Sequence, residues 1–107
     1  MARTLIRGGR LVDGTGNPWF PGDLALEGDR IVAIAPDLGE MPAERTIDAA
    51  GKVVCPGFVD IHSHSDRTIL VNRGAVSSIY QGVTTEIVGN CGMTMAPITP
   101  VSREQML

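Results

Sequence analysis

The chain has 107 residues, a formal net charge of −3 and a mean hydropathy of +0.11, which suits one small domain. Its nine Lys and Arg residues are scattered, and no segment resembles a signal peptide or a spanning helix, so neither nucleic acid nor a membrane is an expected partner. Two cysteines are too few for a disulfide framework, so we expect free thiols in a soluble cytoplasmic protein, with the oligomeric state unknown.

The first half of the chain contains short strand patterns separated by glycine and proline. Residues 13–18 are dense in turn formers and predict a reversal of the chain, and Gly28-Asp29 between two strand patterns predicts a hairpin. Residues 1–53 are therefore expected to form part of an antiparallel β domain. The predicted strands are residues 4–6, 10–12, 23–27, 30–34, 46–49 and 52–54.

The pattern changes after Pro56. Residues 57–61 read as a buried strand, a helical spacing follows at residues 76–80, and residues 83–88 form a second β-branched strand after Gly82. This order predicts a strand, helix, strand unit with parallel strands, and hence an α/β fold. The carboxyl ends of both strands would lie at one edge, where α/β folds assemble their active sites.

Two histidines follow the first of these strands. Because side chains alternate along a strand, His62 and His64 are expected to share a face with Asp60, while Ser63 points away. Two neutral imidazoles so placed can hold one divalent ion, with zinc the first expectation and Asp60 as an orienting group. From spacing alone, two histidines at the start of a loop are an equally good interpretation. Asp66 is either a helix cap or a polar group near the ion, and the cap is the favoured interpretation.

A cysteine follows the second strand. Continued alternation places Cys91 on one face with Gly89, at the same edge as the histidines, where a thiolate would be a soft zinc ligand. An ordinary buried cysteine is the alternative, and it is the interpretation favoured for Cys55, which lies far from the strand end. Glu86 alternates to the other face and is expected to be structural.

Four segments carry a resemblance to a known family. Residues 56–66, PGFVDIHSHSD, resemble the first barrel strand of the amidohydrolase superfamily. Residues 81–92, QGVTTEIVGNCG, resemble the second-strand segment of its N-acyl-D-amino-acid deacylase branch. The segments LIRGGRLVDGTGNP and GDRIVAIAPDLG are similar to the β-sandwich that precedes the barrel in these enzymes.

The resemblance implies a metal-dependent (β/α)₈ barrel preceded by a small β-sandwich. Residues 1–53 would be the N-terminal part of the sandwich, and residues 54–107 the first strands and helix of the barrel. His62 and His64 match the first-strand metal ligands, and Cys91 matches the cysteine ligand of the deacylase branch. The remaining ligands and a catalytic aspartate are expected from later strands, so no catalytic residue is assigned within this chain.

The function implied by the resemblance is zinc-dependent hydrolysis of the amide bond of N-acyl-D-amino acids, which are small-molecule substrates. Two strands cannot close an eight-stranded barrel, so the chain is expected to be a truncated form that is inactive alone. One alternative is an amidohydrolase that acts on cyclic amides, such as a hydantoinase or a dihydroorotase-like enzyme, against which Cys91 argues. A non-catalytic β module that binds a partner is the other alternative.

Overall fold

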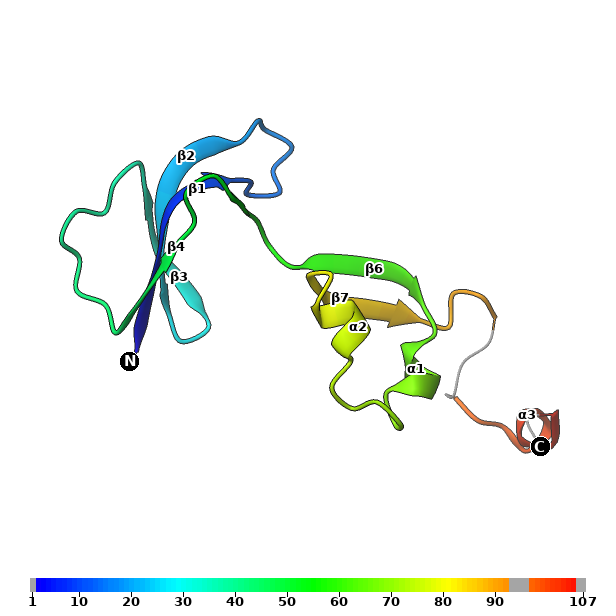
Figure 1. Cartoon of the computed structure of the whole chain (residues 1–107). Helices are drawn as coiled ribbons and strands as arrows, with labels where there is room; N and C mark the ends of the chain where they lie inside the picture. Colours follow the sequence, from blue (N-terminus) through cyan, green and yellow to red (C-terminus); the bar gives the residue numbers. More distant parts are fainter. Residues whose placement is uncertain (1, 93–96, 106–107) are drawn as a thin grey trace. The chain divides into compact units, whose positions relative to one another are not determined.

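A computed structural model describes residues 2–92 and 97–105 of the chain (Figure 1). Contacts between residues divide the chain into two compact units, Met1–Pro56 and Gly57–Leu107. The first unit contains a five-stranded sheet, and the second contains a two-stranded sheet. No helix within the described stretches is long and apolar enough to cross a membrane.

The sheet of the first unit is mixed. Its strands are β1 (Arg3–Leu11), β2 (Phe20–Glu27), β3 (Arg30–Ala35), β4 (Arg45–Asp48) and β5 (Val53–Val54). The predicted hairpin is confirmed, because β2 and β3 pair antiparallel with Glu27 opposite Arg30 around Gly28-Asp29. β1 also pairs antiparallel with β2, but β4 and β5 both run parallel to β1. The expectation of a purely antiparallel unit is therefore wrong for the last two strands.

Strand β1 is continuous where the glycines predicted two separate strands. Its register against β2 shifts between Ile6 and Gly9, and Gly8 between them has a φ of 69°. This backbone region is readily adopted by glycine, so Gly8 allows a bulge rather than a break in the strand. Because β1 continues through the bulge, it pairs with β2, β4 and β5 along its length.

The first unit contains one buried carboxylate, Asp23, among the residues that the structure describes. Asp23 is only 5% exposed, and it accepts hydrogen bonds from the backbone N–H groups of Gly8 (2.9 Å) and Leu38 (3.1 Å) and from Arg7 Nη1 (3.2 Å). Burial alone raises the pKa of Asp23, but these two N–H groups and the charge of Arg7 outweigh burial and lower it. The buried apolar side chains are Leu5, Leu11, Ala25 and Ala49.

This carboxylate makes the stability of the first unit depend on pH. A group whose pKa is lowered by folding adds stability above its ordinary pKa, which is about 3.9 for Asp. That contribution is lost as the pH falls through the lower pKa of the folded state. Acid is therefore expected to destabilise this unit through Asp23.

The second unit has the predicted order of strand, helix and strand (Figure 1). Strand β6 (Phe58–Ser63) pairs parallel with β7 (Val83–Val88), as the sequence predicts. The connection between them contains two short helices, α1 (Ser65–Thr68) and α2 (Val76–Ile79). A third helix, α3 (Pro100–Gln105), follows later in the chain. The second unit is thus a small α/β arrangement whose two strands end at a common edge.

Candidate metal centre

The two histidines lie at the carboxyl end of β6, but in different backbone settings. His62 belongs to the strand, and its backbone N–H donates to the carboxylate of Asp60 at 2.9 Å. His64 lies one residue beyond the strand, with φ −117° and ψ 22°, at the position that precedes the first residue of α1. Strand alternation therefore accounts for the direction of His62, whereas the turn into α1 sets the direction of His64.

Cys91 lies in a tight turn after β7. Gly89 has a φ of 85°, and the N–H of Gly92 donates to the Gly89 carbonyl at 3.0 Å. The expectation that strand alternation continues to Cys91 is wrong, because Gly89 takes the chain out of the extended conformation. The side chain of Asn90, which the residue pattern did not single out, donates to the Ile61 carbonyl at 3.1 Å and ties this turn to β6.

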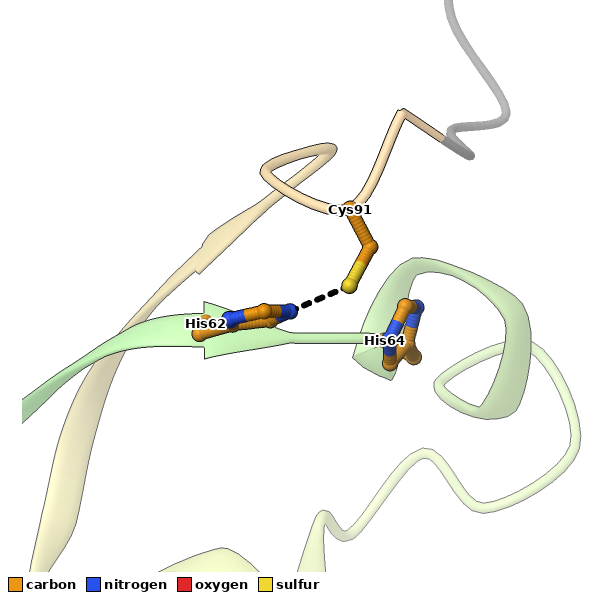
Figure 2. A group of neighbouring side chains, drawn as sticks. All are labelled: His62, His64 and Cys91. Carbon is orange, nitrogen blue, oxygen red and sulfur yellow. Dashed lines mark hydrogen bonds between the residues drawn. The ribbon is translucent and has the colours of Figure 1, made fainter.

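The three predicted ligand residues nevertheless come together. The side chains of His62, His64 and Cys91 point toward one another in Figure 2, and one ligand atom from each lies within 4.8 Å of the others. His62 Nε2 contacts Cys91 Sγ, and the two imidazole centroids are 5.9 Å apart. The parallel pairing of β6 with β7, together with the turns at their ends, produces this cluster.

The donor set of the cluster fits a zinc ion. Zinc binds imidazole nitrogen at about 2.0–2.1 Å and thiolate sulfur at about 2.3 Å, so two tetrahedral ligand atoms lie roughly 3.5 Å apart. The spread of up to 4.8 Å among the three atoms is compatible with that geometry. Three protein ligands leave a fourth position for a water or substrate. All three side chains are exposed, and metal binding itself stays a prediction.

Four other predicted residues lie outside the cluster. Asp60 holds the backbone of His62, so its role in orienting an imidazole stays a prediction. Cys55 is exposed in the segment that follows β5, so the expectation of a packed cysteine is wrong. Asp66 lies in the first turn of α1 and not at the cap position, so its predicted capping role is also wrong. Glu86 accepts a hydrogen bond from Ser78 of α2 at 2.6 Å, in keeping with its predicted structural role.

Residues 45–104 match the amidohydrolase family. The chain belongs to this family. It is 46% identical over 94 residues to D-aminoacylase of Alcaligenes xylosoxydans xylosoxydans, an alignment that covers 88% of the chain and 19% of that enzyme. The resemblance seen in the sequence is thereby confirmed.

Two solved enzyme structures are similar to the chain. N-acyl-D-glutamate deacylase from Bordetella bronchiseptica, complexed with zinc and a phosphonate inhibitor, is 44% identical with a TM-score of 0.81, covering 88% of the chain and 20% of that protein. L-hydantoinase from Arthrobacter aurescens is 33% identical with a TM-score of 0.66, covering 80% of the chain and 20% of that protein. The chain thus spans about a fifth of the length of these relatives.

Proposed function

We propose that this chain supplies the first metal ligands of a zinc-dependent amidohydrolase that cleaves the amide bond of N-acyl-D-amino acids. The observation that carries the proposal is the meeting of His62, His64 and Cys91 at the ends of two parallel strands. Active sites of α/β barrels lie at this edge. The similarity to D-aminoacylase and to N-acyl-D-glutamate deacylase supports the choice of substrate class.

The chemistry of the three side chains suits this role. Zinc bound to them would act as a Lewis acid toward the amide carbonyl and would make water acidic enough to attack at neutral pH. Both imidazoles bind in their neutral form and Cys91 binds as a thiolate, so the ligand set contributes a single negative charge. The acid that protonates the leaving amine is not assigned to any residue of the chain.

The proposal includes a larger fold. Residues 1–53 form the N-terminal part of a β-sandwich, and residues 54–107 form the first strands and helix of a (β/α)₈ barrel; the division of contacts at Pro56 supports this organisation. Phe58 and Ile61 of β6 are 58% and 68% exposed, as expected for side chains that further barrel elements cover. Because two strands do not close a barrel, the 107 residues alone are expected to be inactive.

The proposal also concerns the cellular location of the protein and the two alternative functions. A cytoplasmic location is part of the proposal, and Cys55 and Cys91 are both free thiols. The likeness to L-hydantoinase keeps hydrolysis of a cyclic amide as a second candidate. Cys91 lies within the ligand cluster and matches the cysteine ligand of the deacylase branch, so the cluster favours a deacylase over a cyclic amidase. A non-catalytic β module would require no metal cluster, and the meeting of three ligand atoms argues against it.

An assay of two substrate classes tests the proposal. The full protein that contains this chain is incubated with N-acyl-D-amino acids and, separately, with hydantoins, before and after zinc is removed by a chelator. We expect hydrolysis of the acyl-D-amino acids that is lost with the metal and restored by zinc. Turnover of hydantoins alone would favour the cyclic amidase, and activity that resists metal removal would overturn the proposal.

A further inference from the structure

The turn that carries Cys91 comprises residues 89–92, and Asn90 and Cys91 are its two central residues. The N–H of Gly92 donates to the Gly89 carbonyl at 3.0 Å, which is the bond that closes a β-turn. This bond sets the shape of the turn but joins the turn only to itself. Strand β7 has already ended before the turn begins. The position of the Cys91 thiol relative to β6 therefore depends on contacts that the turn makes outside itself.

The side chain of Asn90 makes such a contact. Its Nδ2 donates to the Ile61 carbonyl of β6 at 3.1 Å. Figure 2 shows the Cys91 side chain directed from this turn toward His62 at the end of β6. Asn90 directly precedes Cys91, and Ile61 directly precedes His62. One hydrogen bond thus joins the two residues that come immediately before two of the predicted ligands.

The peptide group that Asn90 contacts is held on its other side as well. The register of β6 against β7 shifts between Asp60 and Ser63, which marks a bulge at which backbone groups leave the regular ladder. The carboxylate of Asp60 accepts from the His62 N–H at 2.9 Å, and Asn90 donates to the Ile61 carbonyl on the opposite side of the same peptide. This peptide group is therefore a fixed point at the end of β6.

We propose that Asn90 is a positioning residue of the metal centre, which anchors the Cys91 turn to the peptide group before His62 and thereby holds the thiol within reach of the ion. This inference rests on the proposed function, because it presupposes that the cluster binds zinc. Ligand atoms of a tetrahedral zinc ion lie roughly 3.5 Å apart. Since a displacement of about 1 Å is enough to spoil such a site, the turn needs an anchor on the strand that carries His62.

The role requires a hydrogen-bond donor at this position. A carbonyl oxygen only accepts hydrogen bonds, and the NH₂ group is the part of an asparagine side chain that can donate to it. Asn90 does not have a positive φ, so alanine can take the same backbone conformation without strain. Asn90→Ala therefore removes the donor while the turn can still form.

The test measures zinc affinity by competition with a chromogenic chelator, in the full protein that contains this chain. Groups that support metal ligands typically change the affinity by about 10- to 100-fold. Because the bond to Ile61 is exposed and water competes for the amide, we expect Asn90→Ala to weaken zinc binding by about tenfold. Asn72→Ala, at an exposed asparagine between α1 and α2, is the matched control and should leave the affinity unchanged. An affinity in Asn90→Ala equal to that of the unsubstituted protein would overturn the inference.

A double-substitution cycle with Cys91 distinguishes positioning from a general loss of stability. If Asn90 acts by placing the thiol, Asn90→Ala should have no further effect on zinc affinity in a protein that already carries Cys91→Ala. Equal losses with and without the thiol would indicate general destabilisation and would overturn the inference, leaving the proposed metal site standing. Unchanged zinc affinity in Cys91→Ala itself would overturn the proposed site together with the inference.

Glutamine at the same position tests the donor itself. Asn90→Gln keeps an amide NH₂ group, on a side chain one methylene longer, and so still offers a donor to the Ile61 carbonyl. This variant should bind zinc several-fold more tightly than Asn90→Ala. Losses of equal size in the two variants would show that the amide does not anchor the turn, and would overturn the inference.

Discussion

Replacing Cys91 by alanine is expected to weaken zinc binding by roughly 100- to 1,000-fold while the five-stranded sheet of the first unit remains folded. Structural zinc sites with four ligands are worth roughly 10–16 kcal/mol, or about 2.5–4 kcal/mol per ligand. Since each 1.4 kcal/mol is a tenfold change in affinity, one lost ligand corresponds to roughly two to three powers of ten. Cys91 is exposed in a turn, so its truncation leaves no cavity in a core.

Cys55 provides the matched control for this experiment. It is also exposed, but it belongs to the other compact unit and is absent from the ligand cluster. Cys55→Ala should leave zinc affinity unchanged and should alter the free energy of unfolding by less than about 0.5 kcal/mol, as is usual for surface substitutions. The comparison thus separates the loss of a predicted zinc ligand from the loss of an exposed thiol outside the cluster.

Cobalt substitution makes the result visible for each variant. A thiolate bound to Co²⁺ gives a charge-transfer absorption that imidazole ligands do not give. We expect this band in the unsubstituted chain and in Cys55→Ala, and its loss in Cys91→Ala. If Cys91→Ala keeps both the band and the zinc affinity, Cys91 is not a ligand, and only His62 and His64 would remain as candidate metal ligands.

Three further outcomes are expected. His64→Ala should lower zinc content far more than Ser63→Ala, as measured by metal analysis, and equal losses would contradict the assignment of the ligand. Asp23→Asn should lower the free energy of unfolding in urea by about 1–3 kcal/mol at neutral pH, because a buried acceptor loses its charge. The difference from the unsubstituted chain should begin to shrink below about pH 3.9, the ordinary pKa of Asp, and should disappear once the pH has fallen past the lower pKa of Asp23 in the folded state. Gly57→Ala should destabilise the β6–β7 pair by about 1–3 kcal/mol, because its Cβ would lie 2.7 Å from the Thr84 Cβ, and unchanged hydrogen exchange in these strands would refute this.

The elements that sequence patterns predicted well are those specified locally. The hairpin of β2 and β3 has its turn, Gly28-Asp29, directly between two strand patterns, so neighbouring residues determine it. The pairing of β1 with β4 joins residues about forty positions apart in parallel, and no local pattern encodes it. Gly8 was read as a strand break because composition does not distinguish a bulge from an end.

The sequence predicted which three residues come together, but strand alternation explains the position of only one of them. Alternation along a strand explains His62, but His64 and Cys91 reach the cluster through turns that begin where the strands end. The position of these residues at the ends of two parallel strands was the informative signal. Cys55 was misjudged because the burial of a cysteine depends on neighbours that its local sequence does not identify.

The predicted ligands His62 and Cys91 are 29 residues apart and come from the ends of different strands. An ion bound to both residues would close the loop that contains α1 and α2. Closing this loop costs conformational entropy, and metal coordination would offset that cost together with strand pairing. A two-stranded sheet is marginally stable by itself, whereas an ion present at 100 times its Kd would add about 2.7 kcal/mol. With zinc bound at the proposed site, the affinity for zinc and the persistence of the β6–β7 pair would be linked quantities, and the stability of this pair would depend on the concentration of free zinc.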